Sequence, residues 1–400
     1  MKKYDVIIAG AGPAGLVTAL HLLQLRPQLS GCVAAIERAR HPRPKVCAGG
    51  LIPRVITTLR ALGVSVQVPA VRVFAGSAVT EVGGINLEPS SDPLCTIIRR
   101  DEFDAMLLEH AQAAGLEIID NTRVLAVRAD KYKVGVETTQ GSFESRVLVG
   151  ADGSGSRVRT SVFGQGKHNL GRALIVELPV PDRQAEGFKD GYRFNFNCVA
   201  AGVRGYCWSF PCLISGEPHL NLGIYDQSPG GARAVMMSEL LRQLHVAFPE
   251  LNSSRVHGVR LRIKSFPIRW YDPSDRYTHG RVILAGDAAG VDPLMGEGIS
   301  YALEHGRLAG AAIARYLDGD HTALDAYGLK LHQGMIGRKL KRLAFAARRF
   351  YGPHHRFYFR LARSSSRLQR IAVDWYNGAR GLDEMSITRA ALRFLLHGSL

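Results

Sequence analysis

The hydrophobic pattern at the start of the chain predicts a strand, a helix and a second strand. Residues 4–9 (YDVIIA) are a short apolar run with β-branched side chains, which is typical of a buried strand. Residues 16–25 have the spacing of a helix that ends before Pro27, and residues 33–37 (VAAIE) form a second apolar run. These segments make a βαβ unit within about 35 residues.

The rest of the pattern alternates between helical segments and runs of short strands. Short strands broken by glycine are expected over residues 71–98 and 173–226. The pattern also predicts helices at 100–114, 232–248 and 299–317, strands at 117–119, 123–129, 134–138, 143–150, 259–270 and 281–285, and a helical region after residue 322.

This order favours an α/β fold in which a Rossmann-like domain is interleaved with an antiparallel β-sheet domain. We expect the nucleotide-binding domain to comprise residues 1–70, 99–170 and 271–325. The β-sheet domain, expected to bind substrate, would comprise residues 71–98 and 171–270. A basic helical region of residues 326–400 would follow.

Composition excludes several classes of protein. Of the 400 residues, 46% are hydrophobic and 22% are charged, which is ordinary globular usage and not that of a disordered or collagen-like chain. The six cysteines form no CxxC pair and no zinc-type spacing, so we expect a reducing, cytoplasmic environment and no metal site. No apolar stretch reaches the length of a transmembrane helix.

The net charge of +16 is unevenly distributed. Residues 330–400 contain 15 basic and 3 acidic residues, a net charge of +12. The first 329 residues hold 36 basic and 32 acidic residues, so their net charge is only +4. A basic segment implies an acidic partner, which could be anionic lipid, nucleic acid or an acidic protein.

A glycine-rich motif follows the first predicted strand. Residues 10–15 (GAGPAG) match GxGxxG, in which glycines allow a tight turn and the close approach of a pyrophosphate to a helix N-terminus. Glu37 ends the next strand, where its carboxylate can accept hydrogen bonds from a ribose, so FAD or NAD suits this site better than NADP. The residues expected to bind the dinucleotide here are Gly10, Gly12, Pro13, Ala14, Gly15, Glu37 and Arg38.

Two later strands also end in an aspartate among small residues. Asp152 and Gly153 follow the strand at 143–150, and Gly286 and Asp287 follow the strand at 281–285. Such positions let a cofactor pass close to the backbone, with a carboxylate available for its hydroxyl groups. Each could be a plain surface turn, but three such elements in this order make that interpretation improbable.

Together these segments resemble the FAD-binding pattern of the para-hydroxybenzoate hydroxylase superfamily. Residues 99–104 (RRDEFD) are similar to its R-x-x-F-D segment. Residues 45–50 (KVCAGG) and 205–211 (GYCWSFP) resemble the K-x-C-x-G-G and Y-x-W-x-F-P segments of geranylgeranyl reductases, and residues 286–299 (GDAAGVDPLMGEGI) resemble their long FAD motif.

The resemblance implies an FAD-dependent enzyme that reduces carbon–carbon double bonds in a polyprenyl chain. The carrier of that chain stays open among archaeal lipids, chlorophyll precursors and quinones. The electron donor, NAD(P)H or ferredoxin, also stays open, since no second GxGxxG is found. The further residues that the resemblance assigns to FAD are Lys45, Cys47, Ala48, Arg100, Asp152, Gly153, Gly286, Asp287, Pro293, Gly296, Glu297, Gly298 and Ile299.

Three residues are candidates for the chemistry. Reduction of an isolated alkene requires a proton and a hydride on a dry, preorganised surface. The neutral thiol of Cys47 could donate the proton or only shape the pocket. Tyr206 and Trp208 alternate on one strand, so they share a face and, with Phe210, could form the wall of an apolar slot or only a core. The Tyr206 phenol could also relay a proton.

Two other functions share these motifs. A flavin-dependent monooxygenase or halogenase acting on an aromatic substrate would carry the same FAD segments. A flavoprotein without catalytic activity, docking on a membrane or a partner, is the second alternative.

The basic C-terminal region has helical periodicity. Leu340, Leu343, Ala347 and Phe350 form one stripe on residues 338–351, with cations off the stripe. Apolar and aromatic groups beside cations are typical of a helix at a membrane surface, which would suit a polyprenyl substrate. The alternatives are a helix packed on the enzyme with a solvated basic face, or a docking site for an acidic electron donor. Nucleic acid is not expected, because no binding motif accompanies the charge.

Overall fold

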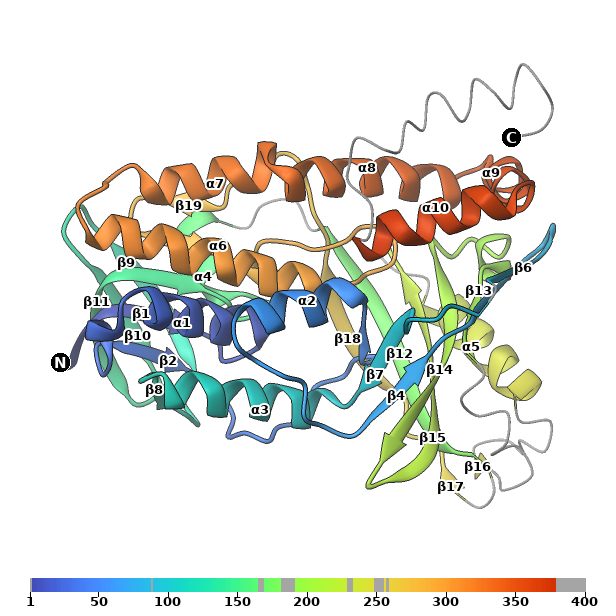
Figure 1. The fold of residues 1–400 in the computed structure, drawn as a ribbon, viewed down its shortest axis with the longest axis horizontal. Helices are drawn as coiled ribbons and strands as arrows, with labels where there is room; N and C mark the ends of the chain where they lie inside the picture. Colours follow the sequence, from blue (N-terminus) through green and yellow to red (C-terminus); the bar gives the residue numbers. More distant parts are fainter. Residues whose placement is uncertain are drawn as a thin grey trace.

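A computed structural model of the chain describes residues 2–87, 89–164, 169–180, 191–228, 233–247, 255–256 and 259–378 (Figure 1). Its first sheet has a parallel centre with strand order β20-β11-β1-β2-β8. β19 pairs antiparallel with β20, and the β9–β10 hairpin extends from β11. The strands are β1 (Lys2–Ala9), β2 (Val33–Ile36), β8 (Glu117–Ile119), β9 (Val124–Ala129), β10 (Val134–Thr138), β11 (Gly141–Gly150), β19 (Thr278–His279) and β20 (Val282–Leu284).

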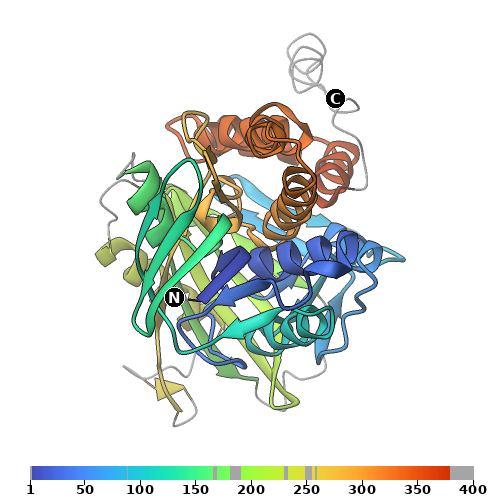
Figure 2. The same ribbon diagram turned by 90° about the vertical axis from the view of Figure 1, so that its left-hand side faces the viewer.

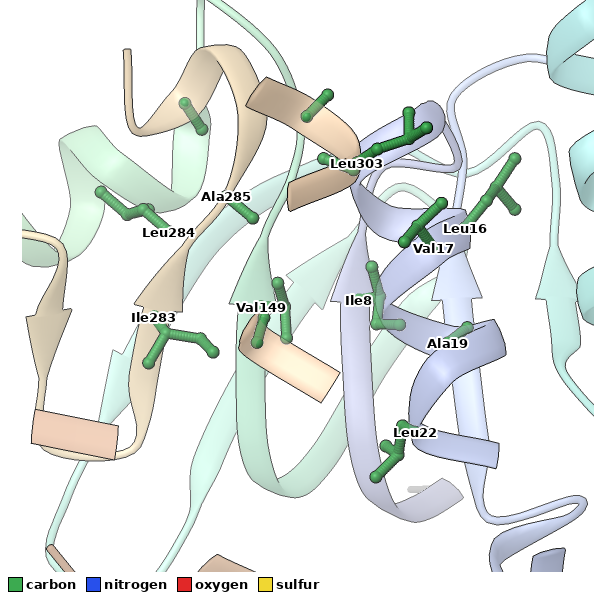
Figure 3. Close-up of a cluster of buried hydrophobic side chains, with 14 of the residues drawn as sticks. Ile8, Leu16, Val17, Ala19, Leu22, Val149, Ile283, Leu284, Ala285 and Leu303 are labelled. Atoms are coloured by element: carbon green, nitrogen blue, oxygen red, sulfur yellow. The ribbon is translucent and has the colours of Figure 1, made fainter. Parts of the chain in front are cut away.

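Helix α1 (Pro13–Leu25) is packed between this sheet and α6 (Ile299–Leu317), and α3 (Arg100–Ala113) lies beside α1. Helix α6 can lie close to α1 because its residues at the points of contact include glycines. A Cβ on Gly306 would lie 2.7 Å from the Ala14 carbonyl oxygen, and one on Gly310 would lie 3.0 Å from the Leu22 nitrogen. Figure 3 shows the apolar core around β1, β11, β20, α1 and α6, with Ile8, Leu16, Val17, Leu22, Val149, Ile283 and Leu303.

The second sheet has seven strands in the order β18-β12-β15-β14-β13-β5-β6, and it has two different apolar faces. Leu174 and Ile224 on one face pack under helix α5 (Arg233–Ala247), whereas Ile175, Tyr206 and Tyr225 on the other face belong to a separate cluster. The strands are β5 (Gly76–Thr80), β6 (Gly83–Leu87), β12 (Leu170–Pro179), β13 (Tyr192–Asn195), β14 (Gly205–Ile214), β15 (Glu217–Asp226) and β18 (Lys264–Arg269).

These two sheets confirm the predicted α/β fold with an interleaved antiparallel domain. Some elements differ from the sequence prediction. The expected strand at 259–270 is divided into β17 (Val259–Arg260) and β18, and two short helices, α2 (Pro53–Ala61) and α4 (Arg157–Phe163), were not predicted. A two-stranded sheet joins β16 (Arg255–Val256) to β17, and a small sheet contains β3 (Gly50–Leu51), β7 (Cys95–Ile98) and β4 (Ala70–Val73).

The described part of the C-terminal region is packed on the rest of the molecule. It forms α7 (Ala323–Gln333), α8 (Met335–Phe350), α9 (His355–Arg363) and α10 (Ser366–Asn377) along one side of the molecule (Figures 1 and 2). The stripe that suggested a membrane contact is turned inward: Leu340, Leu343 and Ala347 are buried, and Phe350 is half-buried. The stripe is therefore covered by protein and cannot face a bilayer.

Residues 379–400, the end of the predicted basic region, lie outside the described residues. Among the described helices, none is long and apolar enough to cross a membrane.

Candidate active site

One cavity of about 1200 Å³ runs from the glycine-rich turn after β1, past Cys47, to the C-terminal helices. It brings together predicted site residues from every part of the chain. Those that line it are Gly10, Gly12, Pro13, Ala14, Glu37, Arg38, Lys45, Cys47, Ala48, Arg100, Asp152, Gly153, Tyr206, Trp208, Phe210, Gly286, Asp287, Gly296, Glu297, Gly298 and Ile299. Gly15 and Pro293 are not among the lining residues.

The end of the cavity near β1 fits a dinucleotide. No side chain caps the N-terminus of α1, and its first turn contains no acidic residue, so its backbone N–H groups are suited to an anion. A Cβ on Gly153 or Gly155 would meet nothing within 4 Å, so the backbone here borders open space. Gly15 has a different role, because its Cβ would lie 2.1 Å from the Gly10 carbonyl oxygen. It permits close packing and does not contact the cavity.

Glu37 is held in place by the backbone. It accepts hydrogen bonds from the N–H groups of Ala11 at 3.0 Å and Ala39 at 3.2 Å. Arg43, which the sequence analysis did not identify, lies 3.5 Å from both Glu37 and Asp104. A fixed carboxylate at this point on the cavity wall suits the ribose hydroxyls of a dinucleotide.

The two predicted aspartates differ in their contacts. Asp152 accepts hydrogen bonds from Ser156 Oγ at 2.5 Å and from the Arg157 N–H at 2.6 Å, at the start of α4. Its carboxylate therefore orders the chain locally, although it also borders the cavity. Asp287 accepts one bond from Ser154 Oγ at 3.0 Å, and it also lines the cavity.

The loop between β20 and α6 is anchored by tyrosines from distant elements. Asp292 is fully buried and accepts a 2.7 Å hydrogen bond from Tyr376 Oη of α10. Tyr351 Oη donates to the Leu294 carbonyl at 2.6 Å, and Tyr206 Oη donates to the Met295 carbonyl. Because the Tyr206 hydroxyl proton is held by a backbone carbonyl, this contact favours a role in supporting the loop over a proton relay.

Glu297 in the same loop bonds locally. Its carboxylate accepts hydrogen bonds from the N–H and the hydroxyl of Ser300 in the first turn of α6. Burial raises the pKa of both Glu297 and Asp292. These contacts fit an acid that orders the start of a helix.

Cys47 lies where the dinucleotide end of the cavity meets its apolar end. The Gly49 N–H donates to Cys47 Sγ at 3.3 Å, and the Arg100 side chain also interacts with the thiol. Arg100 itself forms a two-point ion pair with Asp104, at 2.8 and 3.0 Å. These contacts hold the Cys47 side chain in a fixed position at the cavity wall.

Asn221 fixes the position of this cysteine, and the sequence analysis did not identify it. The Trp208 indole N–H donates to Asn221 Oδ1 at 2.9 Å, and the Asn221 amide donates to the Cys47 carbonyl at 3.2 Å. Asn221 is buried. The contact crosses 174 positions of sequence, so no local pattern could have indicated it.

The apolar end of the cavity is lined by aromatic rings. The Phe194 ring centroid lies 5.2 Å from that of Tyr206 and 5.4 Å from that of Phe210. Tyr192 and Tyr225 complete the group and were not predicted, although aromatic residues alternate along residues 192–196. Edge-to-face rings of this kind give a rigid, dry wall.

Lys45 supplies a titratable charge to the cavity. Its ammonium lies 3.1 Å from the centroid of the Phe266 ring, and burial lowers its pKa to about 8. A nearby anion raises the pKa again, so binding of an anionic cofactor is strongest below pH 8 and weakens as the pH rises above it. We expect FAD affinity, measured by fluorescence titration, to fall about tenfold between pH 7 and pH 10.

The control for this expectation is Lys45→Met, which is uncharged at every pH. This variant should bind FAD more weakly at pH 7, and its affinity should change little with pH. An equal pH dependence in both proteins would assign the titration to another group.

The fold, the glycine-rich turn at residues 10–15 and the fixed carboxylate of Glu37 define an FAD-dependent oxidoreductase. The chain belongs to the FAD binding domain family, which it matches over residues 3–334.

Named relatives include reductases and a monooxygenase. The chain is 26% identical to geranylgeranyl diphosphate reductase of Rhodobacter capsulatus over 338 residues, which are 80% of this chain and 78% of the relative. It is 27% identical to rifampicin monooxygenase of Rhodococcus hoagii, over 79% of this chain and 64% of the relative.

Among solved structures, a geranylgeranyl bacteriochlorophyll reductase-like protein from Thermoplasma acidophilum is similar with a TM-score of 0.75. It is 20% identical, with 98% of this chain and 96% of that chain covered. This similarity establishes the fold. Taken with the named relatives, it confirms the resemblance to geranylgeranyl reductases that the motifs indicated.

Proposed function

We propose that this protein reduces carbon–carbon double bonds in a polyprenyl chain. The observation that carries the proposal is the continuity of the large cavity, in which the end at the glycine-rich turn of residues 10–15 opens past Cys47 into an aromatic, apolar space. An isoprenoid needs a long apolar site that is open to the flavin and closed to water.

When bound, FAD in its reduced form supplies a hydride for the reaction. The protein must supply the proton that is added to the other alkene carbon. In our proposal the Cys47 thiol donates this proton to the less substituted carbon, and solvent then reprotonates the sulfur. One hydride and one proton convert the double bond to a single bond.

The aromatic wall orients the substrate. Tyr206, Trp208 and Phe210 hold the chain against the cofactor side of the cavity and exclude water, which would otherwise trap a developing cation. Residues 294–297 of the anchored loop line the same space, and their backbone would help to hold the cofactor.

The test is anaerobic mixing of the chemically reduced enzyme with geranylgeranyl diphosphate, geranylgeranyl glycerolipids and menaquinone in detergent. We expect flavin reoxidation and a mass gain of two hydrogens per reduced bond with at least one substrate class. If no substrate class is saturated, the proposal fails. Hydroxylation of an aromatic compound under oxygen would instead support a monooxygenase.

Asn221 should position Cys47 for this reaction. Asn221→Ala removes two hydrogen bonds, and we expect kcat to fall about tenfold with little change in KM or FAD content. The alkylation rate of Cys47 should change in parallel, which general destabilisation at a distance would not cause. Trp208→Phe removes only one of the two bonds, so its effect on the Cys47 alkylation rate should be smaller. An unchanged kcat in Asn221→Ala would contradict this role.

A further inference from the structure

The cavity reaches the protein surface among the C-terminal helices. Its exposed lining residues there include Phe345 and Arg349 of α8, Phe357 of α9 and Ala372 of α10. Phe345 and Phe357 each expose 46% of their surface to solvent. Large aromatic side chains are therefore found at the opening of an apolar cavity.

The same helices carry most of the net positive charge of the chain. Residues 334–378 contain 11 Lys and Arg and one acidic residue, Asp374. Glu81, in the turn between β5 and β6, lies 3.4 Å from the Arg356 side chain. We define the C-terminal face by its exposed side chains: Arg338, Lys341, Phe345, Arg348, Arg349, Arg356, Phe357, Arg360, Arg363, Arg367 and Arg370.

Helix geometry places these cations around the aromatic groups. On α8 the side that includes Leu340 and Leu343 is buried, and Phe345 lies near the middle of the opposite side. Exposed cations flank it, and the Arg349 guanidinium lies 4.5 Å from the Phe345 ring centroid. Apolar rings surrounded by cations match the chemistry of an anionic lipid surface.

We propose that the C-terminal face docks on an anionic membrane leaflet, with the cavity opening turned toward the bilayer. This inference deepens the proposed function, because a polyprenyl chain could then pass from the lipid into the cavity without crossing water. The cations bind lipid phosphates, while Phe345 and Phe357 enter the acyl boundary. A nucleic acid or an acidic protein could use the charge, but neither would deliver an apolar substrate to the cavity opening.

The test is co-sedimentation of the full-length protein with phosphatidylcholine vesicles, with and without phosphatidylglycerol. We expect binding to the anionic vesicles, and at least about tenfold weaker binding to neutral vesicles or in high salt. A protein that fails to bind anionic vesicles, or that binds both kinds equally, would overturn the proposal. Failure to bind vesicles together with binding to a DNA duplex or an acidic protein would also overturn it.

A double variant tests the aromatic residues directly. Phe345→Ser with Phe357→Ser should weaken binding to anionic vesicles about tenfold. The matched control is Leu125→Ser with Tyr132→Ser, which changes residues that are 48% and 69% exposed in and beside the β9–β10 hairpin. The control should bind like wild type. Equal binding by the Phe variant would show that the rings do not enter the membrane and would overturn the proposal.

Catalysis separates this inference from the proposed function. Relative to wild type, the Phe variant should lose at least about tenfold more activity toward a substrate in anionic vesicles than toward the same substrate in detergent, because only the vesicle assay requires docking. If neither protein reduces any substrate while vesicle binding still depends on Phe345 and Phe357, the proposed function fails and the docking surface stands.

Discussion

Replacing Cys47 with alanine is expected to lower alkene reduction by about 10²- to 10⁴-fold, the usual contribution of a general acid. The thiol lies between the glycine-rich turn at residues 10–15 and the aromatic wall, where a proton donor to a bound alkene is required. Alanine keeps the backbone bond from Asn221, so the loop should retain its shape. Flavin reoxidation in a single turnover measures the rate, and the visible spectrum measures bound FAD.

Two variants serve as controls for this prediction. Cys32→Ala also removes a partly exposed thiol, but Cys32 does not line the cavity, so its rate should equal that of wild type. Cys47→Ser keeps a small polar group that is a weaker acid, and its rate should stay far below that of wild type. A Cys47→Ala enzyme with an unchanged rate would exclude the thiol from the mechanism.

Gly10→Ala is expected to weaken FAD binding by more than about 100-fold. Gly10 has a φ of +101°, which is unfavourable for alanine, and the added Cβ would lie 2.4 Å from the Ala151 carbonyl oxygen. To relieve this clash, the ends of β1 and β11 must move apart, and these ends form the expected dinucleotide site. Fluorescence titration with FAD measures the loss.

The control is Gly141→Ala, which introduces backbone strain without a steric clash. Gly141 also has a positive φ, of +115°, but a Cβ there would meet nothing within 4 Å. This variant should lose only about 1–2 kcal/mol of stability and bind FAD normally. If Gly10→Ala bound FAD as tightly as Gly141→Ala, the proposed position of the cofactor would be wrong.

The parts of the site that sequence predicted are those built from short segments. The glycine turn, Glu37 and Asp287 each follow directly from a strand, so adjacent residues indicate both the element and its end. Asp152 shows the limit of this reasoning. An aspartate after a strand can face a cofactor or order the next helix, and here its carboxylate accepts bonds from the first turn of α4.

The parts that sequence could not predict depend on contacts between distant segments. The apolar stripe of α8 indicated an amphipathic helix, but periodicity does not tell whether protein or lipid covers the stripe. Because this stripe is buried, the net charge of +16 no longer indicates a helix whose apolar side lies on a membrane. The described part of the basic region, up to residue 378, forms part of the wall and the opening of the cavity, and its outer side remains available to a partner.

The bond from Tyr376 to Asp292 has a consequence for how the protein is made. Asp292 belongs to the loop of the cofactor site, yet its partner lies 84 residues further along the chain. During synthesis the glycine-rich turn and the sheet that positions it can form once the strands up to β20 have left the ribosome. The loop at residues 292–297 can reach its final arrangement only after α10 has emerged, so this side of the cofactor site is completed later than the glycine-rich turn.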